Sequence, residues 1–183
     1  MISSSSTHSR QPSNIIKLAG QRAENLYKNH KLCCSESLLL VLNHGFEGGL
    51  PAETIKQLGS GFCGGMNAGC TCGALSGAIM GLGLLLGPHA KNGLSKKKFR
   101  ALSKKMHDRF HDRFASTCCR VLIEPFDKNK KGRSLYCKGL TESTAEIAVS
   151  LLLEAVPGII DKADIDFLSS RDSMIAGFMK KLR

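Results

Sequence analysis

The chain has 183 residues and a formal net charge of +11, and 42% of its residues are hydrophobic. That apolar share is ordinary for globular proteins and excludes a chain that is disordered throughout. No apolar run approaches the roughly 20 residues of a membrane span, and the absence of Trp disfavours a protein that stacks single-stranded nucleic acid on aromatic rings.

Residues 1–12 are polar and rich in serine, so we expect a disordered tail there. This segment has neither a basic start nor the apolar stretch of a secretory signal. The sequence therefore predicts a cytoplasmic protein.

The rest of the chain predicts an all-α fold, a compact bundle of about 6–7 helices. Apolar residues recur at helical spacing, for example at Leu102, Met106 and Phe110, and no segment favours a strand. We expect a helical domain over residues 13–156 and a C-terminal helical extension over 157–183. The expected helices are 13–30, 34–42, 51–58, 71–87, 95–115 and 118–123, one from Thr141 or Ser143 to 155, and 164–183; residues 127–133 read as a solvated loop.

Glycine is concentrated just before the fourth of these helices. Five glycines fall within residues 59–69, which predicts a sharply turning loop that feeds a central helix. Within that helix Gly73, Gly77 and Gly81 recur every four residues. Because each glycine costs a helix about 1 kcal/mol, we expect another helix or a cofactor to lie against this stripe.

Eight cysteines are many for a chain of this length. Without a secretory signal, clustered thiols point to metal binding or redox chemistry rather than to a disulfide framework. Neighbouring side chains point in different directions, so at most one member of each adjacent pair should face a shared site. Cys63 reads as a small buried hydrophobic residue. The cysteines are Cys33, Cys34, Cys63, Cys70, Cys72, Cys118, Cys119 and Cys137.

The stretch from Cys70 to Cys72 opens a helix directly after the glycine-rich loop. The free amides and dipole of a helix N-terminus stabilise a thiolate, which would lower the pKa of a thiol at this position. Such a thiol suits metal ligation or redox exchange.

Two further patterns have ordinary structural explanations. His107 and His111 lie four residues apart, a metal-binding spacing, but the neighbouring Asp and Arg residues favour an exposed, ion-paired face. The basic runs at 96–105, 128–133 and 180–183 lie on separate elements. They favour a solvated surface that steers an acidic redox partner rather than a nucleic-acid site.

Several segments resemble the C_GCAxxG_C_C family of redox-active proteins, which is defined by four cysteines and a C-G-A-x-x-G motif. The similarity covers roughly residues 15–155, and the family also resembles the cluster-bearing part of split-Soret cytochromes, whose haem motifs are missing here. The segments are Cys34-Ser35-Glu36-Ser37-Leu38-Leu39, Gly61-Phe62-Cys63-Gly64-Gly65-Met66, Cys72-Gly73-Ala74-Leu75-Ser76-Gly77-Ala78, Phe114-Ala115-Ser116-Thr117-Cys118-Cys119-Arg120-Val121-Leu122 and Cys137.

This resemblance implies that Cys34, Cys72, Cys119 and Cys137 converge on one site, with Cys137 in a loop. Four thiolates from distant segments suit an iron–sulfur cluster of the [2Fe–2S] or [4Fe–4S] type. Gly64, Gly65 and Gly73 would then let backbone amides approach the cluster.

The function expected on this basis is electron transfer or redox sensing by a carrier rather than a stand-alone enzyme, with no catalytic residue. A redox partner protein, acidic if the basic surface steers it, is the expected partner, and a homodimer is an alternative. Two other functions stay open. In a thiol–disulfide protein Cys72 would attack a substrate or pair with Cys34, Cys119 or Cys70. In a structural zinc protein the same four cysteines would be the ligands.

Overall fold

The computed structural model describes residues 10–29, 32–91 and 93–171, and these residues form an all-α fold, as the sequence predicts. Within these ranges there is no β-strand, only one isolated antiparallel bridge between Thr71 and Cys118. The helices are α2 (Pro12–Asn29), α3 (Cys34–Gly45), α4 (Ala52–Ser60), η1 (Gly65–Gly69), α5 (Gly73–Leu86), α6 (Lys96–Phe114), α7 (Cys119–Ile123), η2 (Glu124–Phe126), α8 (Lys130–Ala155), η3 (Pro157–Lys162) and α9 (Ile165–Ser169).

Helix α3 lies at the centre of the bundle. It packs against α2, α4, α5, α8 and α9, and every residue from Ser37 to Asn43 is buried. A helix that is apolar on all sides must be covered on all sides. The buried side-chain amide of Asn43, near the end of α3, donates to the Leu50 carbonyl at 2.8 Å and accepts from the Leu50 N–H at 3.0 Å.

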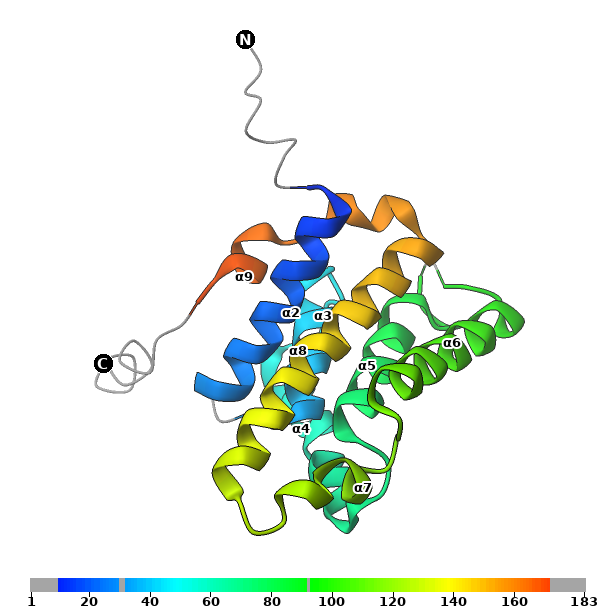
Figure 1. Ribbon diagram of the computed structural model, residues 1–183. Helices are drawn as coiled ribbons and strands as arrows, with labels where there is room; N and C mark the ends of the chain where they lie inside the picture. Colours follow the sequence, from blue (N-terminus) through cyan, green and yellow to red (C-terminus); the bar gives the residue numbers. More distant parts are fainter. Residues whose placement is uncertain (1–9, 30–31, 92, 172–183) are drawn as a thin grey trace.

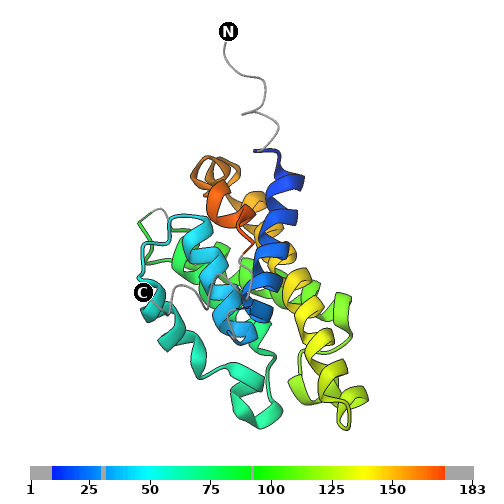
Figure 2. The same ribbon diagram turned by 90° about the vertical axis from the view of Figure 1, so that its left-hand side faces the viewer.

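The other helices cover α3 on two sides. Helices α2 and α8 run side by side along one face (Figure 1), while α4 lies on the opposite side of α3 (Figure 2). Helix α6 packs on α5 and α8 through Leu102, Met106 and Phe110, and Ser95 caps its N-terminus by accepting from the Lys98 N–H. Both the cap and the buried face agree with the sequence prediction.

The glycine stripe of α5 is the contact surface for α3. A Cβ atom added at Gly77 would lie 2.5 Å from the Ser35 carbonyl oxygen, and one at Gly81 would overlap the Leu42 side chain. The prediction that a helix lies against this stripe is therefore confirmed. The close approach brings the start of α3 next to the start of α5.

The start of the helix that holds Cys137 was predicted wrongly. Helix α8 begins at Lys130, not near Ser143, so Cys137 lies within a helix and not in a loop. The side chain of Asn129 accepts from the Gly132 N–H at 2.8 Å and caps the helix. The Phe126 and Tyr136 rings stack 5.1 Å apart and hold the first turns against the preceding segment.

The C-terminal extension is partly described. It contains η3 and the five-residue α9, which packs on α2 and α3. Of the tail predicted to be disordered over residues 1–12, residues 1–9 lie outside the described residues, but Arg10 donates to the Ile160 and Asp161 carbonyls and Pro12 begins α2, so the prediction is wrong for residues 10–12. The helix predicted over 164–183 ends at Ser169 in α9, and the part beyond 171 lies outside the described residues. Within the described ranges, no helix combines the length and apolarity that crossing a bilayer requires.

Candidate metal centre

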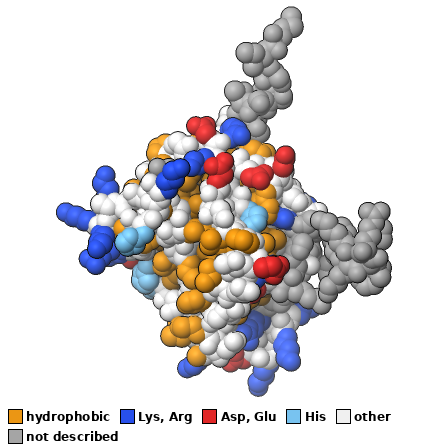
Figure 3. Space-filling view, turned by 180° about the vertical axis from the view of Figure 1, so that it is seen from behind, with side chains coloured by type: hydrophobic (Ala, Val, Ile, Leu, Met, Phe, Trp, Pro, Cys, Tyr) orange, Lys and Arg blue, Asp and Glu red, His pale blue; other side chains and the backbone are white. Residues whose placement is uncertain are grey.

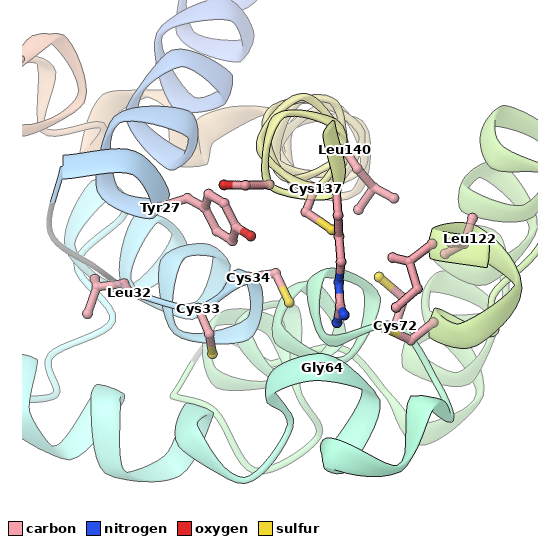
Figure 4. Close-up of a pocket in the computed structure, with 13 residues that line it drawn as sticks. Tyr27, Leu32, Cys33, Cys34, Gly64, Cys72, Leu122, Cys137 and Leu140 are labelled. Carbon is pink, nitrogen blue, oxygen red and sulfur yellow. The ribbon is translucent and has the colours of Figure 1, made fainter. Parts of the chain in front are cut away.

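The four cysteines that the family resemblance singles out line one pocket of about 320 Å³. Cys34 begins α3, Cys72 is the N-cap of α5, Cys119 begins α7 and Cys137 lies in the second turn of α8. Figure 4 shows the labelled Cys34, Cys72 and Cys137 side chains around this common space. The pocket wall is otherwise mainly apolar, formed by Leu32, Leu122, Ile123 and Leu140.

A short extended pairing places Cys72 and Cys119 in the pocket. The Cys72 N–H donates to the Thr117 carbonyl at 2.8 Å, and the Cys119 N–H donates to the Cys70 carbonyl at 2.6 Å. Successive side chains of extended backbone point to opposite sides. Cys119 therefore faces the pocket, while the thiol of the neighbouring Cys118 contacts the Gly69 carbonyl at 3.3 Å. Cys72 also lines the pocket, and Cys70, two residues earlier, is exposed.

The glycine-rich segment folds over this pairing. Gly64, at φ +59°, lines the pocket, and its backbone amide donates to the Cys34 sulfur. Gly65, at φ +65°, packs behind the site, where an added Cβ would lie 2.8 Å from the Cys119 Cβ. At Gly73 an added Cβ would lie 2.6 Å from the Cys34 sulfur. All three predicted glycines thus border the cysteines, but only Gly64 lines the pocket.

Burial governs the ionisation of these thiols. Desolvation raises the pKa of Cys72 to about 12 and that of Cys137 to about 11, and it also raises the pKa values of Cys34 and Cys119. The backbone amides of Ala74 and Leu75 lower the pKa of Cys72, as expected at a helix start, yet their effect is smaller than that of burial. The predicted lowering of the pKa at this position is therefore outweighed in the metal-free protein.

Two residues that the sequence analysis missed also face the sulfurs. The Tyr27 hydroxyl, on α2, hydrogen-bonds to the Cys137 sulfur, and burial raises the pKa of Tyr27 itself to about 12. Arg133, in the first turn of α8, lines the pocket and lowers the pKa of both Cys119 and Cys137 through its charge. No sequence signal marked Tyr27, and Arg133 lay in a segment that reads as a solvated loop.

A disulfide lies beside the pocket. Cys33, the N-cap of α3, is bonded to Cys63, and their Cα atoms are 5.6 Å apart. The expectation that Cys63 is merely a small buried hydrophobic residue is therefore wrong. Cys33 and Cys34 both border the pocket, but the labelled Cys33 side chain points away from its centre (Figure 4).

The disulfide overlaps a second group of possible metal donors. The donor atoms of Cys33, Glu36 and Cys63 lie within 4.8 Å of one another. The Glu36 carboxylate accepts from the Cys33 N–H at 2.8 Å, and the two sulfurs are bonded to each other. These cysteines offer thiolate ligands only after reduction.

The predicted histidine pair is exposed rather than part of the site. The rings of His107 and His111 lie parallel with centroids 6.5 Å apart on α6, and His107 pairs with Asp108 at 3.2 Å. This is the ion-paired surface that the sequence predicts.

Comparison with known proteins assigns the chain to a family. A family model described as "Putative redox-active protein (C_GCAxxG_C_C)" matches residues 32–151, a span that contains all four pocket cysteines. No curated protein and no solved structure matches the chain. Because the matched segment covers well over half of the sequence, the chain belongs to the C_GCAxxG_C_C family of redox-active proteins.

Proposed function

We propose that this redox protein binds an iron–sulfur cluster through Cys34, Cys72, Cys119 and Cys137 and serves electron transfer or redox sensing. The observation that carries the proposal is that four cysteines from four different helices line a single pocket. Four cysteine ligands are the usual set for both [2Fe–2S] and [4Fe–4S] clusters.

The spacing of the sulfurs favours a cluster over a single zinc ion. Tetrahedral zinc with Zn–S bonds of about 2.3 Å brings its sulfurs to about 3.8 Å from one another. Among the described residues, no three of these four cysteines have sulfurs that all lie within 4.8 Å of one another. A multi-iron centre holds its ligands further apart than one ion does, which suits the wider arrangement.

The surroundings of the sulfurs fit a bound cationic centre. Burial raises the pKa values of all four thiols, which makes them costly to ionise alone, and metal binding offsets this cost as the thiols lose their protons. A bound cluster would supply one-electron chemistry. The Gly64, Ala74 and Leu75 amides and the Tyr27 hydroxyl each lower the pKa of a pocket cysteine, and groups that favour negative charge on the sulfurs stabilise the more negative, reduced state. Arg133 acts in the same direction through its charge.

Metal and sulfide analysis of anaerobically purified protein tests the proposal. We expect the wild type to be brown, with visible charge-transfer absorption, and to contain iron and acid-labile sulfide. Cys72→Ser removes a pocket ligand and should lose most of both, whereas Cys70→Ser, two residues away and exposed, should keep them. A wild type without iron under strict anaerobiosis, or one with stoichiometric zinc instead, would contradict the proposal.

A second candidate is thiol–disulfide exchange, favoured by the Cys33–Cys63 bond. A thiolate of a reduced partner would attack one of these sulfurs, and the other would leave as a thiolate. A second exchange would then release the partner as a disulfide, so that two electrons and two protons reach Cys33 and Cys63. In this form of exchange the Cys33–Cys63 disulfide reacts, whereas the sequence analysis expected Cys72 to be the attacking thiol. Burial raises the pKa of Cys72 and so opposes its use as a nucleophile.

Thiol counting against redox buffers tests this second candidate. We expect six free thiols in the oxidised metal-free protein and eight after reduction, as there are eight cysteines and one disulfide. An exchange-active bond should open at about −120 to −270 mV, the range of disulfide oxidoreductases, while a structural one needs potentials below about −300 mV. A Cys33→Ser, Cys63→Ser variant should show six thiols under both conditions. A reduction midpoint potential below about −300 mV would show that the Cys33–Cys63 disulfide is purely structural.

A further inference from the structure

Exposed apolar residues lie on the elements at the end of the molecule that holds the cysteine pocket. In the described part of the chain the large exposed hydrophobic residues are Leu58, Met66, Val121 and Leu135. Met66 lies on η1, Val121 on α7 and Leu135 near the start of α8, and α7 packs on both η1 and α8 at this end of the molecule (Figure 1). Val121 is 53% exposed and Leu135 is 67% exposed. Single exposed apolar residues are common, but three on adjoining elements at one end of the molecule suit a binding surface.

The same end of the molecule is strongly basic. Residues 120–138 contain six Lys or Arg and only two acidic residues, Glu124 and Asp127. Seen from behind, Lys and Arg side chains gather at the lower end of the molecule (Figure 3), which is the end formed by η1, α7 and the start of α8 in Figure 1.

A second, shallow pocket connects these features to the cysteine site. It is lined by Lys28, Lys131, Leu135 and Lys138, and it shares Tyr27 and Ser134 with the cysteine pocket. Lys138 is paired with Glu24 at 2.6 Å, whereas Lys130 and Lys131 are exposed. Leu135 and these lysines therefore lie beside the cysteine pocket.

We propose that this surface docks a small acidic electron-transfer protein. The docking surface consists of Met66, Val121 and Leu135, flanked by Arg120, Lys130 and Lys131; the proposal rests on the function proposed above. An apolar centre with a charged rim is the usual arrangement of protein interfaces. Opposite charges speed the encounter and fix its orientation. Each encounter would pass one electron between the partner's cofactor and the cysteine-bound centre, and no atom would be transferred.

Charge argues against the two other occupants. In a symmetric dimer of this face, the basic residues of one copy would meet those of the other, which is unfavourable. A nucleic acid would use the positive charge but would leave Val121 and Leu135 without apolar partners.

Binding of an acidic flavodoxin, used as the probe, tests the proposal. Lys130→Glu/Lys131→Glu reverses two charges in the first turn of α8, and Lys96→Glu/Lys97→Glu makes the same change in the first turn of α6. Both changes suit a helix N-terminus, so neither should unfold the chain. We expect the α8 variant to weaken binding by more than about tenfold and the α6 control by less than about twofold. Leu135→Ser should weaken binding at every salt concentration.

Several results would overturn the proposal. Equal weakening by the two double variants would mean that only net charge matters, and no measurable flavodoxin binding by the wild type would refute the surface directly. A wild-type dimer that Leu135→Ser dissociates would assign the surface to a second copy. Flavodoxin binding does not require a bound iron–sulfur cluster. The outcome of the iron and sulfide analysis is therefore independent of the outcome of the binding experiment.

Discussion

Replacing Gly73 with valine should abolish metal loading while leaving most of the helical bundle intact. A Cβ at this position lies 2.6 Å from the Cys34 sulfur and 2.6 Å from the Phe62 carbonyl oxygen, closer than such atoms approach in real structures. The Cys34 sulfur must then move, and changes around metal ligands typically reduce metal affinity by about 10–100-fold. We therefore expect iron per folded chain to fall at least about tenfold.

Gly61→Val is the matched control for this prediction. Gly61 lies in the same glycine-rich segment, has a right-handed helical backbone and has open space where a Cβ would be added. It should keep wild-type iron. Far-UV circular dichroism gives the folded fraction for each protein, and Gly73→Ala supplies a milder variant if valine lowers it. Full iron occupancy in Gly73→Val would show that close approach at this position has no role in the site.

The sequence was sufficient to predict the elements whose signals are local. The apolar spacing of residues 102–110 and the Ser95 cap define α6, and the four-residue glycine repeat identifies the face of α5 that meets α3. The adjacency of Cys72 to a helix start follows from the glycines before it. The pocket cysteines, in contrast, were chosen by resemblance to a family, because spacing along the chain does not tell which distant thiols meet.

The features that were missed depend on contacts between distant segments. The residues 130–133, Lys-Lys-Gly-Arg, resemble a loop, and they become helical because Asn129 caps them and Phe126 stacks on Tyr136. Cys33 meets Cys63 because Gly59 of α4 packs against Glu36 of α3, where an added Cβ would lie 3.0 Å from the Glu36 Cα. Tyr27 reaches Cys137 only through the packing of α2 on α8.

A substitution in the contact between α3 and α5 should have the second large effect, a loss of stability. Gly77→Ala should lower the free energy of unfolding by about 1–3 kcal/mol, the usual cost of overpacking a core. The added Cβ would lie 2.5 Å from the Ser35 carbonyl and 2.8 Å from the Ser35 Cα, so the backbone of α3 must shift. The gain in helix propensity from alanine, about 1 kcal/mol, offsets only part of this cost.

Gly83→Ala is the control in the same helix, and it should act in the opposite direction. Its Cβ would lie 3.5 Å from the Phe99 ring, an ordinary contact, so the propensity gain of about 0.5–1 kcal/mol should appear as added stability. Urea denaturation followed by circular dichroism measures both changes, and equal effects would contradict the packing argument. Because Ser35 follows Cys34, Gly77→Ala should also displace a pocket cysteine and reduce iron occupancy, while Gly83→Ala should not. The α3–α5 contact would thereby link the stability of the bundle to the position of a sulfur in the candidate metal centre.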